Sequence, residues 1–300
     1  MRAKRALPTF IGIGGKKCAT TWLSECLRDH PQIFMSSPKE LNFFDGNGSL
    51  KDIGAYLSHF ARSGEYEAAG EFSSTYLTNP HVAKEIRGCM GQVKIIASIR
   101  NPIDRFVSEC KELIRRGVVA EQNADGGNSI IIGRPLVDRI HQQWPTVISN
   151  GQYFEGLNRY IEVFGRESVH TIIKEELDLD AEQELGRLYR FLGVSSTHKP
   201  AMLKRLVSPS IVPRHAWLED WRHQTFLYCH QQAPSIINWY KRLGIASIYR
   251  WLNADTSAAI RIDVDALEQI IQFYRNDVAG VQQLLGRDIP AWRSINANHV

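Results

Sequence analysis

The sequence predicts an α/β protein with a central parallel sheet flanked by helices, because three apolar strands each precede a helix. The strands are expected at residues 10–13, 93–99 and 169–173. The third strand is followed by a helix over 181–192, which Gly193 ends. The run VKIIASI at 93–99 is rich in β-branched residues and long enough to be buried on both faces of a parallel sheet.

A phosphate-binding turn is predicted directly after the first strand. Residues 14–19 (GGKKCA) carry two glycines and two lysines, and the helix that follows opens on Thr20 and Thr21 and stops at Pro31. Backbone N–H groups at the start of that helix, the two hydroxyls and a lysine converge on one point. A phosphate is the ligand that such a point favours.

The second strand leads into an equally well marked helix. Asn101 is a good helix cap, Pro102 suits the first helical position, and Asp104 favours the positive end of a helix. Apolar residues then recur at helical spacing until Gly117. Arg100 stands at the carboxyl end of the strand, where ligands bind in open α/β sheets.

The rest of the chain is less regular. Residues 118–150 are expected to form a loop-rich insertion, and 195–262 are expected to be irregular and aromatic-rich. A final amphipathic helix is expected over 263–285. Because no linker or internal repeat divides the chain, we predict a single domain over 1–300.

Composition and charge narrow the class of protein. The chain has 300 residues, with 36 Lys and Arg against 32 Asp and Glu and a net charge of +4. This balance is too mild for a dedicated nucleic-acid binder, so we expect no nucleic-acid partner. The apolar runs are far shorter than the ~20 residues of a membrane span, so we expect no stable membrane insertion. Five scattered cysteines without Cys-x-x-Cys spacing indicate reduced thiols in a cytoplasm and no zinc site.

Two familiar glycine motifs fail at the phosphate turn. The dinucleotide-binding motif requires a third glycine where Lys17 stands. The P-loop motif requires a lysine beside a hydroxyl, whereas Lys17 precedes Thr20 by three residues. A P-loop kinase that uses ATP and magnesium is therefore disfavoured. A nucleotide-binding scaffold without turnover stays open as an alternative.

The phosphate turn resembles the 5′-phosphosulfate loop of the sulfotransferases that use PAPS (3′-phosphoadenosine 5′-phosphosulfate). Their motif is Lys-x-Gly-Thr-Thr, and residues 17–21 read KCATT, with Ala19 in place of the glycine. Residues 100–108 (RNPIDRFVS) are similar to their 3′-phosphate motif, Arg-(Asn/Asp)-Pro-x-x-Arg-x-x-Ser. Two further segments resemble the heparan-type and bacterial branches. Residues 38–45 (PKELNFFD) resemble Lys-Glu-x-x-Phe-Phe, and 70–77 (GEFSSTYL) resemble Gly-Glu-Lys-Ser-Pro-x-Tyr-Leu.

The resemblance covers most of the chain and implies a P-loop-like sulfotransferase fold. The implied reaction moves a sulfuryl group from PAPS to a hydroxyl and releases PAP, without a metal. The resemblance also gives each donor-site residue a role. At the 5′ end, Lys17 is catalytic at the leaving oxygen, Thr20 and Thr21 bind the 5′-phosphate, and Trp22 lies beneath the loop or beside the adenine. At the 3′ end, Arg100 and Ser108 hold the 3′-phosphate, with Arg214 as a lower-ranked second cation.

Glu40 is the catalytic base that the resemblance implies, because the heparan-type branch uses the matching glutamate in that role. The alternatives are that Glu40 is a surface residue or pairs with Lys39, in which case His141 or His215 is the base. Phe72 stands where some members carry a lysine near the reacting centre. That role is therefore expected to be absent here or supplied elsewhere.

The acceptor is expected to be a small natural product, a glycolipid precursor or a sugar. Residues 118–150 and 195–262 are expected to form its site. Four tryptophans in the second segment either stack on the acceptor or pack in a core: Trp217, Trp221, Trp239 and Trp251. The sequence predicts neither the oligomeric state nor whether an oxygen or a nitrogen is sulfated.

Overall fold

The structure is a computed structural model that describes residues 7–46, 52–116, 118, 130–204, 212–213, 254–255 and 260–296. The chain falls into two compact units, each built from separate stretches of sequence. Unit 1 comprises residues 1–105, 144–207 and 271–300, and unit 2 comprises 106–143 and 208–270. Unit 2 overlaps much of the two predicted insertions. The single domain over 1–300 stays a prediction, because compact units within a chain are not by themselves separate domains.

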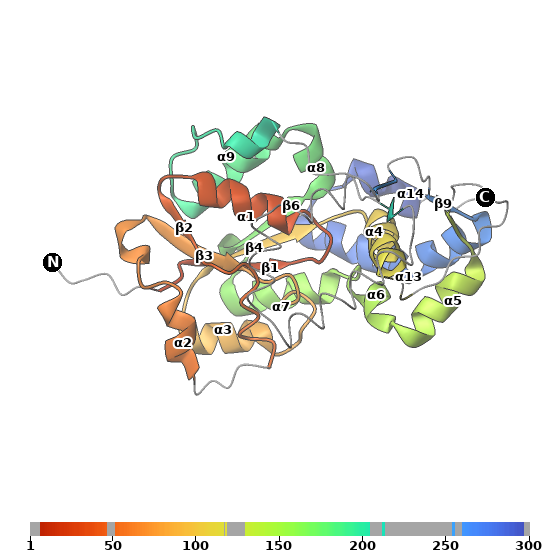
Figure 1. The fold of residues 1–300 in the computed structure, drawn as a ribbon, viewed down its shortest axis with the longest axis horizontal. Coiled ribbons are helices and arrows are strands. Elements are labelled where there is room, and N and C mark those ends of the chain that lie inside the picture. Colours follow the sequence, from red (N-terminus) through yellow and green to blue (C-terminus); the bar gives the residue numbers. More distant parts are fainter. Residues whose placement is uncertain are drawn as a thin grey trace. The chain divides into compact units, whose positions relative to one another are not determined.

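Unit 1 contains a five-stranded parallel sheet, which confirms the predicted fold class (Figure 1). The strand order is β2-β3-β1-β4-β6, with every neighbouring pair parallel. The strands are β1 (Phe10–Gly14), β2 (Ile33–Met35), β3 (Ala68–Phe72), β4 (Lys94–Ile99) and β6 (Val169–Ile173). Three of them match the strands predicted at 10–13, 93–99 and 169–173.

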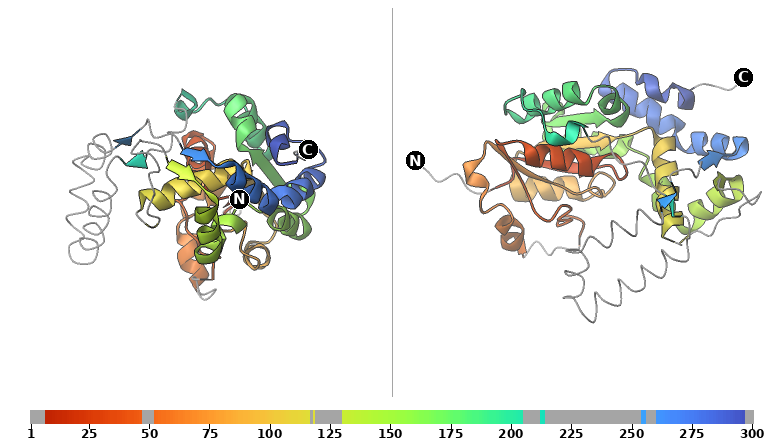
Figure 2. Two further views of the ribbon diagram at one scale, coloured as in Figure 1. Left: turned by 90° about the vertical axis from the view of Figure 1, so that its right-hand side faces the viewer. Right: turned by 45° about the horizontal axis from the view of Figure 1, so that its top comes forward.

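Helices cover both faces of this sheet. In Figure 1, α1 (Thr20–Asp29) and α9 (Ala181–Leu192) lie over one face, and α3 (Val82–Met90) and α7 (Phe154–Phe164) lie over the other. Figure 2 shows α1 and α9 side by side in a turned view. Shorter elements of unit 1 are α2 (Ile53–Ser58), α6 (Pro145–Ser149), α8 (Lys174–Leu179), α14 (Arg293–Asn296) and 3₁₀ turns at Ser63–Glu65, Arg166–Ser168, Ala201–Lys204 and Pro290–Trp292.

Two helices run through both units, and both were predicted. They are α4 (Pro102–Arg115) and α13 (Val264–Leu285). Unit 2 also contains α5 (Arg134–Gln143) and two pairs of short strands. In unit 2, β5 (Ile130–Ile132) pairs with β9 (Ile260–Ile262), and β7 (Val212–Pro213) pairs with β8 (Ala254–Asp255). The expectation of a loop-rich stretch over 118–150 is corrected by α5 and α6, which occupy its second half.

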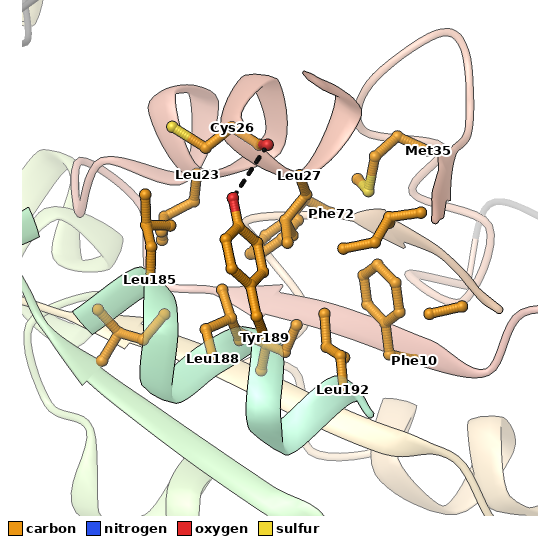
Figure 3. Packing of buried hydrophobic residues seen from close by; sticks show 14 of the residues in the cluster. Phe10, Leu23, Cys26, Leu27, Met35, Phe72, Leu185, Leu188, Tyr189 and Leu192 are labelled. Atoms are coloured by element: carbon orange, nitrogen blue, oxygen red, sulfur yellow. Dashed lines mark hydrogen bonds between the residues drawn. The ribbon is translucent and has the colours of Figure 1, made fainter. Parts of the chain in front are cut away.

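The core of unit 1 fixes α1 on the sheet. Buried side chains of α1, including Leu23 and Leu27, pack against Leu188 and Tyr189 of α9 (Figure 3). The Tyr189 hydroxyl donates to the backbone carbonyl of Cys26 at 3.5 Å, as the dashed line in Figure 3 shows. Each large apolar side chain buried here contributes roughly 1.5–3 kcal/mol. This packing therefore holds the start of α1 at a defined place beside the sheet.

None of the helices in the described residues combines the length and the apolar character that crossing a membrane requires.

Candidate active site

The two predicted phosphate motifs lie where the strand order of the sheet reverses. The chain runs from the central strand β1 to β2 and β3 on one side, and then crosses to β4 and β6 on the other. The carboxyl ends of β1 and β4 are therefore neighbours at the topological switch point, where open α/β sheets bind their ligands. The loop 15–19 follows β1, and Arg100 follows β4. Motifs about eighty residues apart in sequence thus lie at one edge of the sheet.

The loop after β1 is held in a conformation that most residues disfavour. Gly14 has a φ of 105°, and a Cβ at this position would clash with the carbonyl oxygen of Ser74. Lys17 and Ala19 have φ values of 66° and 62°, in the left-handed region. Ala19 is the residue before α1, and its carbonyl accepts the first helical hydrogen bond from the Leu23 N–H at 3.0 Å. The position where the resembled motif has glycine thus adopts the backbone that glycine favours.

Strand β4 anchors the loop through one serine. The Gly15 N–H donates to the carbonyl of Ser98, and the Ser98 hydroxyl donates to the carbonyl of Cys18. The Cys18 thiol is fully buried, 3.7 Å from the Tyr153 hydroxyl. Burial raises the pKa of this thiol to about 11. Cys18 therefore stays protonated near neutral pH and acts as packing rather than as a nucleophile.

The start of α1 presents the groups that the sequence predicted there. Thr21 is exposed, Thr20 is largely buried, and Lys17 is half-buried. No side chain caps α1 within the described part of the chain, and its first turn contains no acidic residue. The first N–H groups of a helix have no partner inside the helix, and they carry the positive end of its dipole. This end of α1 is therefore suited to an anion.

Trp22 packs inside unit 1. Its side chain is 7% exposed and belongs to the core cluster, and its indole N–H donates to the carbonyl of Met202 at 3.3 Å. Of the two expected positions, beneath the loop or beside an adenine, this contact favours the first.

Arg100, which directly follows β4, has one nitrogen without a hydrogen-bond partner in the described part of the chain. Its side chain is 23% exposed, and its only ion pair in the described residues joins Nη2 to Asp104 Oδ2 at 3.9 Å. The Nε atom is buried and has no hydrogen-bond partner among those residues. A buried donor without a partner costs about 1–3 kcal/mol, so a ligand that accepts from it gains affinity. A phosphate suits a guanidinium because it accepts two parallel hydrogen bonds.

The residues after Arg100 hold it in place. The Asn101 side chain accepts from the N–H groups of Ile103 at 3.0 Å and Asp104 at 3.5 Å, which confirms the predicted helix cap. Glu175, on α8, accepts from the Asn101 N–H at 2.9 Å and from the Trp292 indole at 3.1 Å. Sequence reasoning matched the Glu175-Glu176-Leu177 turn to the resembled family but gave Glu175 no role, because the contact joins segments more than seventy residues apart.

Ser108 lies further along the same helix. It is half-buried in α4, in the part of that helix that belongs to unit 2, whereas Arg100 belongs to unit 1. Its placement relative to Arg100 is therefore given only by the continuous helix between them.

Glu40 stands at the same edge of the sheet. It follows β2, its backbone N–H donates to the carbonyl of Phe72 at 3.0 Å, and its φ is 63°. Its carboxylate is 36% exposed and accepts from Lys39 Nζ at 2.6 Å. The pairing with Lys39 that the sequence left open is thus present. An ion pair this exposed contributes about 0–1 kcal/mol, so it leaves the carboxylate available to a substrate.

A buried carboxylate to which sequence reasoning gave no role, although it lies in the matched segment 70–77, is found close to residues 41–44. Glu71 is fully buried in β3, and three hydroxyls donate to it, from Tyr56, Ser73 and Tyr76. Burial raises its pKa to about 7, against the lowering effect of those hydrogen bonds. The signal in the sequence was a single glutamate inside the apolar run AAGEF.

The other predicted site residues are divided between unit 2 and the undescribed part of the chain. His141 is exposed on α5 in unit 2. Arg214, His215 and the tryptophans Trp217, Trp221, Trp239 and Trp251 lie outside the described residues. Among those described, no group of three or more His, Cys, Asp or Glu side chains is placed to hold a metal ion.

Comparison with known proteins yields a consistent set of matches. The family model described as the sulfotransferase domain matches residues 8–212. The bifunctional heparan sulfate N-deacetylase/N-sulfotransferase 1 of Caenorhabditis elegans is 26% identical over 196 residues, which are 64% of this chain and 22% of that protein. The human heparan sulfate glucosamine 3-O-sulfotransferase 3B1 is 25% identical over 190 residues, which are 63% of this chain and 47% of that protein.

A solved structure extends the similarity to nearly the whole chain. The crystal structure of a sulfotransferase from Alicyclobacillus acidocaldarius aligns with a TM-score of 0.65 and 25% identity. The alignment covers 95% of this chain and 98% of that one. By contrast, the match to the nematode relative covers only 22% of that protein.

Proposed function

The chain belongs to the sulfotransferase domain family, and from this premise we propose that it transfers a sulfuryl group from PAPS to an acceptor hydroxyl and releases PAP. One observation carries the proposal. The loop 15–19 and the end of β4 are joined through Ser98 at the switch point of the sheet. Two anion-binding elements side by side suit a nucleotide that carries phosphates at both its 5′ and its 3′ positions.

The loop and the start of α1 bind the 5′ end of PAPS. Thr20, Thr21 and the first N–H groups of α1 donate to the 5′-phosphate. The Lys17 ammonium lies at the oxygen that bridges sulfur and the 5′-phosphate. Negative charge grows on this oxygen as the bond to sulfur breaks, and a fixed cation there lowers the barrier.

The end of β4 and helix α4 bind the 3′ end. The Arg100 guanidinium donates to the 3′-phosphate. Its buried Nε, which has no hydrogen-bond partner among the described residues, supports this role. The Ser108 hydroxyl donates to the same phosphate. This grip distinguishes PAPS and PAP from ADP and ATP, which lack a 3′-phosphate.

Glu40 is the general base of the proposed reaction. Its carboxylate takes the proton of the acceptor hydroxyl, and the oxygen forms a bond to sulfur. The bond between sulfur and the bridging oxygen breaks, and its electron pair leaves with PAP beside Lys17. Lys39 pairs with this carboxylate and places a cation beside it.

The acceptor is a small natural product, a glycolipid precursor or a sugar. The names of the curated relatives include heparan sulfate, which supports a carbohydrate as one acceptor class. We expect residues 118–150 and 195–262 to contribute to its site. The four described cysteines are free thiols (Cys18, Cys26, Cys89 and Cys110), which supports a cytoplasmic location.

Transfer of labelled sulfate from PAPS to a panel of sugars, phenols, lipids and hydroxylated natural products tests this function. We expect transfer to at least one class by the wild type. Lys17→Ala should lower it about a hundredfold or more, as loss of a transition-state charge contact does. Lys84→Ala, at an exposed lysine on α3, is the matched control and should leave transfer unchanged. Equal rates for Lys17→Ala and wild type would contradict the role of Lys17, and a wild type that neither transfers sulfate nor binds PAP would contradict the function.

A further inference from the structure

We propose that Glu71 is a positioning residue, which sets the segment 39–44 and with it the carboxylate of Glu40 through a network of buried hydroxyls. The inference rests on the proposed function, because it needs Glu40 as the base. Glu71 has no exposed surface, so it does not touch an acceptor. Its action must pass through the residues that it contacts.

The network starts from both oxygens of one carboxylate. Glu71 Oε1 accepts from the Tyr56 hydroxyl at 3.1 Å and from the Tyr76 hydroxyl at 3.2 Å. Glu71 Oε2 accepts from the Ser73 hydroxyl at 2.8 Å. Above its pKa of about 7 Glu71 is ionised, and an ionised carboxylate accepts hydrogen bonds and donates none. Each of these hydroxyls therefore directs its single proton at Glu71.

Two of those hydroxyls also hold the backbone of the segment. Ser73 Oγ accepts from the Asn42 N–H at 3.0 Å, and Tyr76 Oη accepts from the Phe44 N–H at 3.3 Å. A hydroxyl whose proton is committed to Glu71 presents only lone pairs to a second partner. Glu71 thus orients the hydroxyls of Ser73 and Tyr76. These hydroxyls in turn hold the backbone of segment 39–44 by accepting from its N–H groups.

The segment needs such support because its backbone is strained. Glu40 and Asn42 have φ values of 63° and 51°, a left-handed conformation that disfavours residues with a Cβ. Conformations of this kind persist where the surroundings over-determine them, and they cluster at functional sites. The backbone of Leu41 between them also hydrogen-bonds to the Glu71 carboxylate. Consecutive residues 40, 41 and 42 are therefore tied to β3 or to the residue after it.

Stability alone does not account for a glutamate at this place. A fully buried carboxylate costs more than an apolar side chain of the same volume, even when hydrogen bonds satisfy it. The burial that raises the pKa of Glu71 to about 7 is the sign of that cost. A role of Glu71 in positioning the catalytic base would explain why the protein keeps a carboxylate at this buried place despite its cost in stability.

Variants that cut one link at a time test the inference. Ser73→Ala removes the acceptor of the Asn42 N–H, and Tyr76→Phe removes that of the Phe44 N–H. Each should lower kcat about tenfold or more while the Kd for PAP changes less than about twofold, because misplacement of a catalytic group acts on the chemical step. Tyr274→Phe removes a buried tyrosine hydroxyl that donates to the backbone carbonyl of Ile148, and it should leave kcat unchanged.

Combination with Glu40→Gln separates this inference from the proposed function. If Ser73 acts through Glu40, adding Ser73→Ala to Glu40→Gln should not lower the residual sulfate transfer further. Full turnover by Glu40→Gln alone would show that the base has been misassigned. Loss of turnover by Glu40→Gln with unchanged kcat in Ser73→Ala and Tyr76→Phe would overturn the positioning role and leave the base in place. The inference would also be overturned if adding Ser73→Ala to Glu40→Gln lowered transfer by the same factor as Ser73→Ala does alone.

Discussion

The Ser98 hydroxyl donates a hydrogen bond to the backbone carbonyl of Cys18, and this bond joins the loop after β1 to the neighbouring strand β4. The carbonyl of Ser98 in turn accepts from the Gly15 N–H, so one residue holds both ends of the loop. Because Arg100 directly follows β4, a single buried serine links the two elements that we propose bind the two ends of the nucleotide.

Ser98→Ala should weaken both the fold and the binding of PAP. The change leaves the Cys18 carbonyl buried without its donor, which costs about 1–3 kcal/mol of unfolding free energy. Denaturant unfolding and calorimetry with PAP measure the two effects. Ser58→Ala is the control, because the Ser58 hydroxyl also donates to a backbone carbonyl, that of Ala55, but at an exposed position. A wild-type affinity for PAP in Ser98→Ala would show that the loop keeps its position without this bond.

Ala19→Gly should stabilise the protein. Ala19 has a φ of 62°, and the left-handed conformation costs a residue with a Cβ roughly 1–2 kcal/mol. Part of that gain is offset by the greater freedom of glycine in the unfolded chain, roughly 0.4–1 kcal/mol. We expect a net rise in unfolding free energy of up to about 1 kcal/mol. Ala55→Gly, on the exposed side of α2, should instead destabilise, and a loss of stability of equal size in both variants would contradict the strain at Ala19.

Arg100→Ala should weaken PAP binding but not ADP binding. Removal of a charge-assisted pair with the 3′-phosphate costs about 2 kcal/mol, which is about thirtyfold in Kd. ADP lacks that phosphate, so its Kd should stay within about twofold of the wild-type value. Arg116→Ala serves as the control, since Arg116 is exposed and pairs with Glu112. Parallel losses for PAP and ADP would mean that Arg100 supports the fold of the site and does not bind the 3′-phosphate.

The pH dependence of stability should carry the signature of Glu71. Its pKa is raised from 4.5 to about 7 in the folded protein, so the folded state holds a proton that the unfolded state has lost between those values. The stability that this proton contributes is complete below pH 4.5 and is lost as pH rises through about 7.

Glu71→Gln removes this titration and isolates its effect. The unfolding free energy of wild type minus that of the variant should fall by up to roughly 3 kcal/mol from pH 4.5 to about 7 and then level off. Chemical unfolding of both proteins at several pH values measures the difference. A difference that stays flat or rises with pH would contradict the raised pKa.

The elements that sequence reasoning predicted are those with strong local signals. Strand β4 is a long β-branched run, α9 ends at Gly193 in the left-handed conformation, and the Asn101 cap marks the start of α4. The sheet strands that it missed are short or lack such signals. Strand β2 has three residues, and β3 contains AAGEF, in which two alanines and a glycine give little strand preference.

The candidate site likewise contains residues with a local sequence signal and residues without one. Lys17, Thr20, Thr21 and Arg100 were predicted because glycines, hydroxyls and basic residues at strand ends form a local pattern. The roles of Ser98, Glu71 and Glu175 come from contacts between distant segments, such as the 2.9 Å bond from Asn101 to Glu175. Tertiary contacts of this kind leave no periodic pattern in the sequence. The substitution of Ala19 for glycine was visible, but the backbone conformation that makes it costly was not.

The binding of PAP, ADP and ATP with magnesium to the full chain, followed by thermal shift, tests the central claim most directly. A ligand at about a hundred times its Kd stabilises the folded state by about 2.7 kcal/mol, enough to raise the melting temperature by a few degrees. We predict a clear rise with PAP, a much smaller rise with ADP at the same concentration, and loss of that difference in Arg100→Ala. A rise with ATP and magnesium but not with PAP, or equal rises with PAP and ADP, would contradict a site built for a nucleotide with a 3′-phosphate.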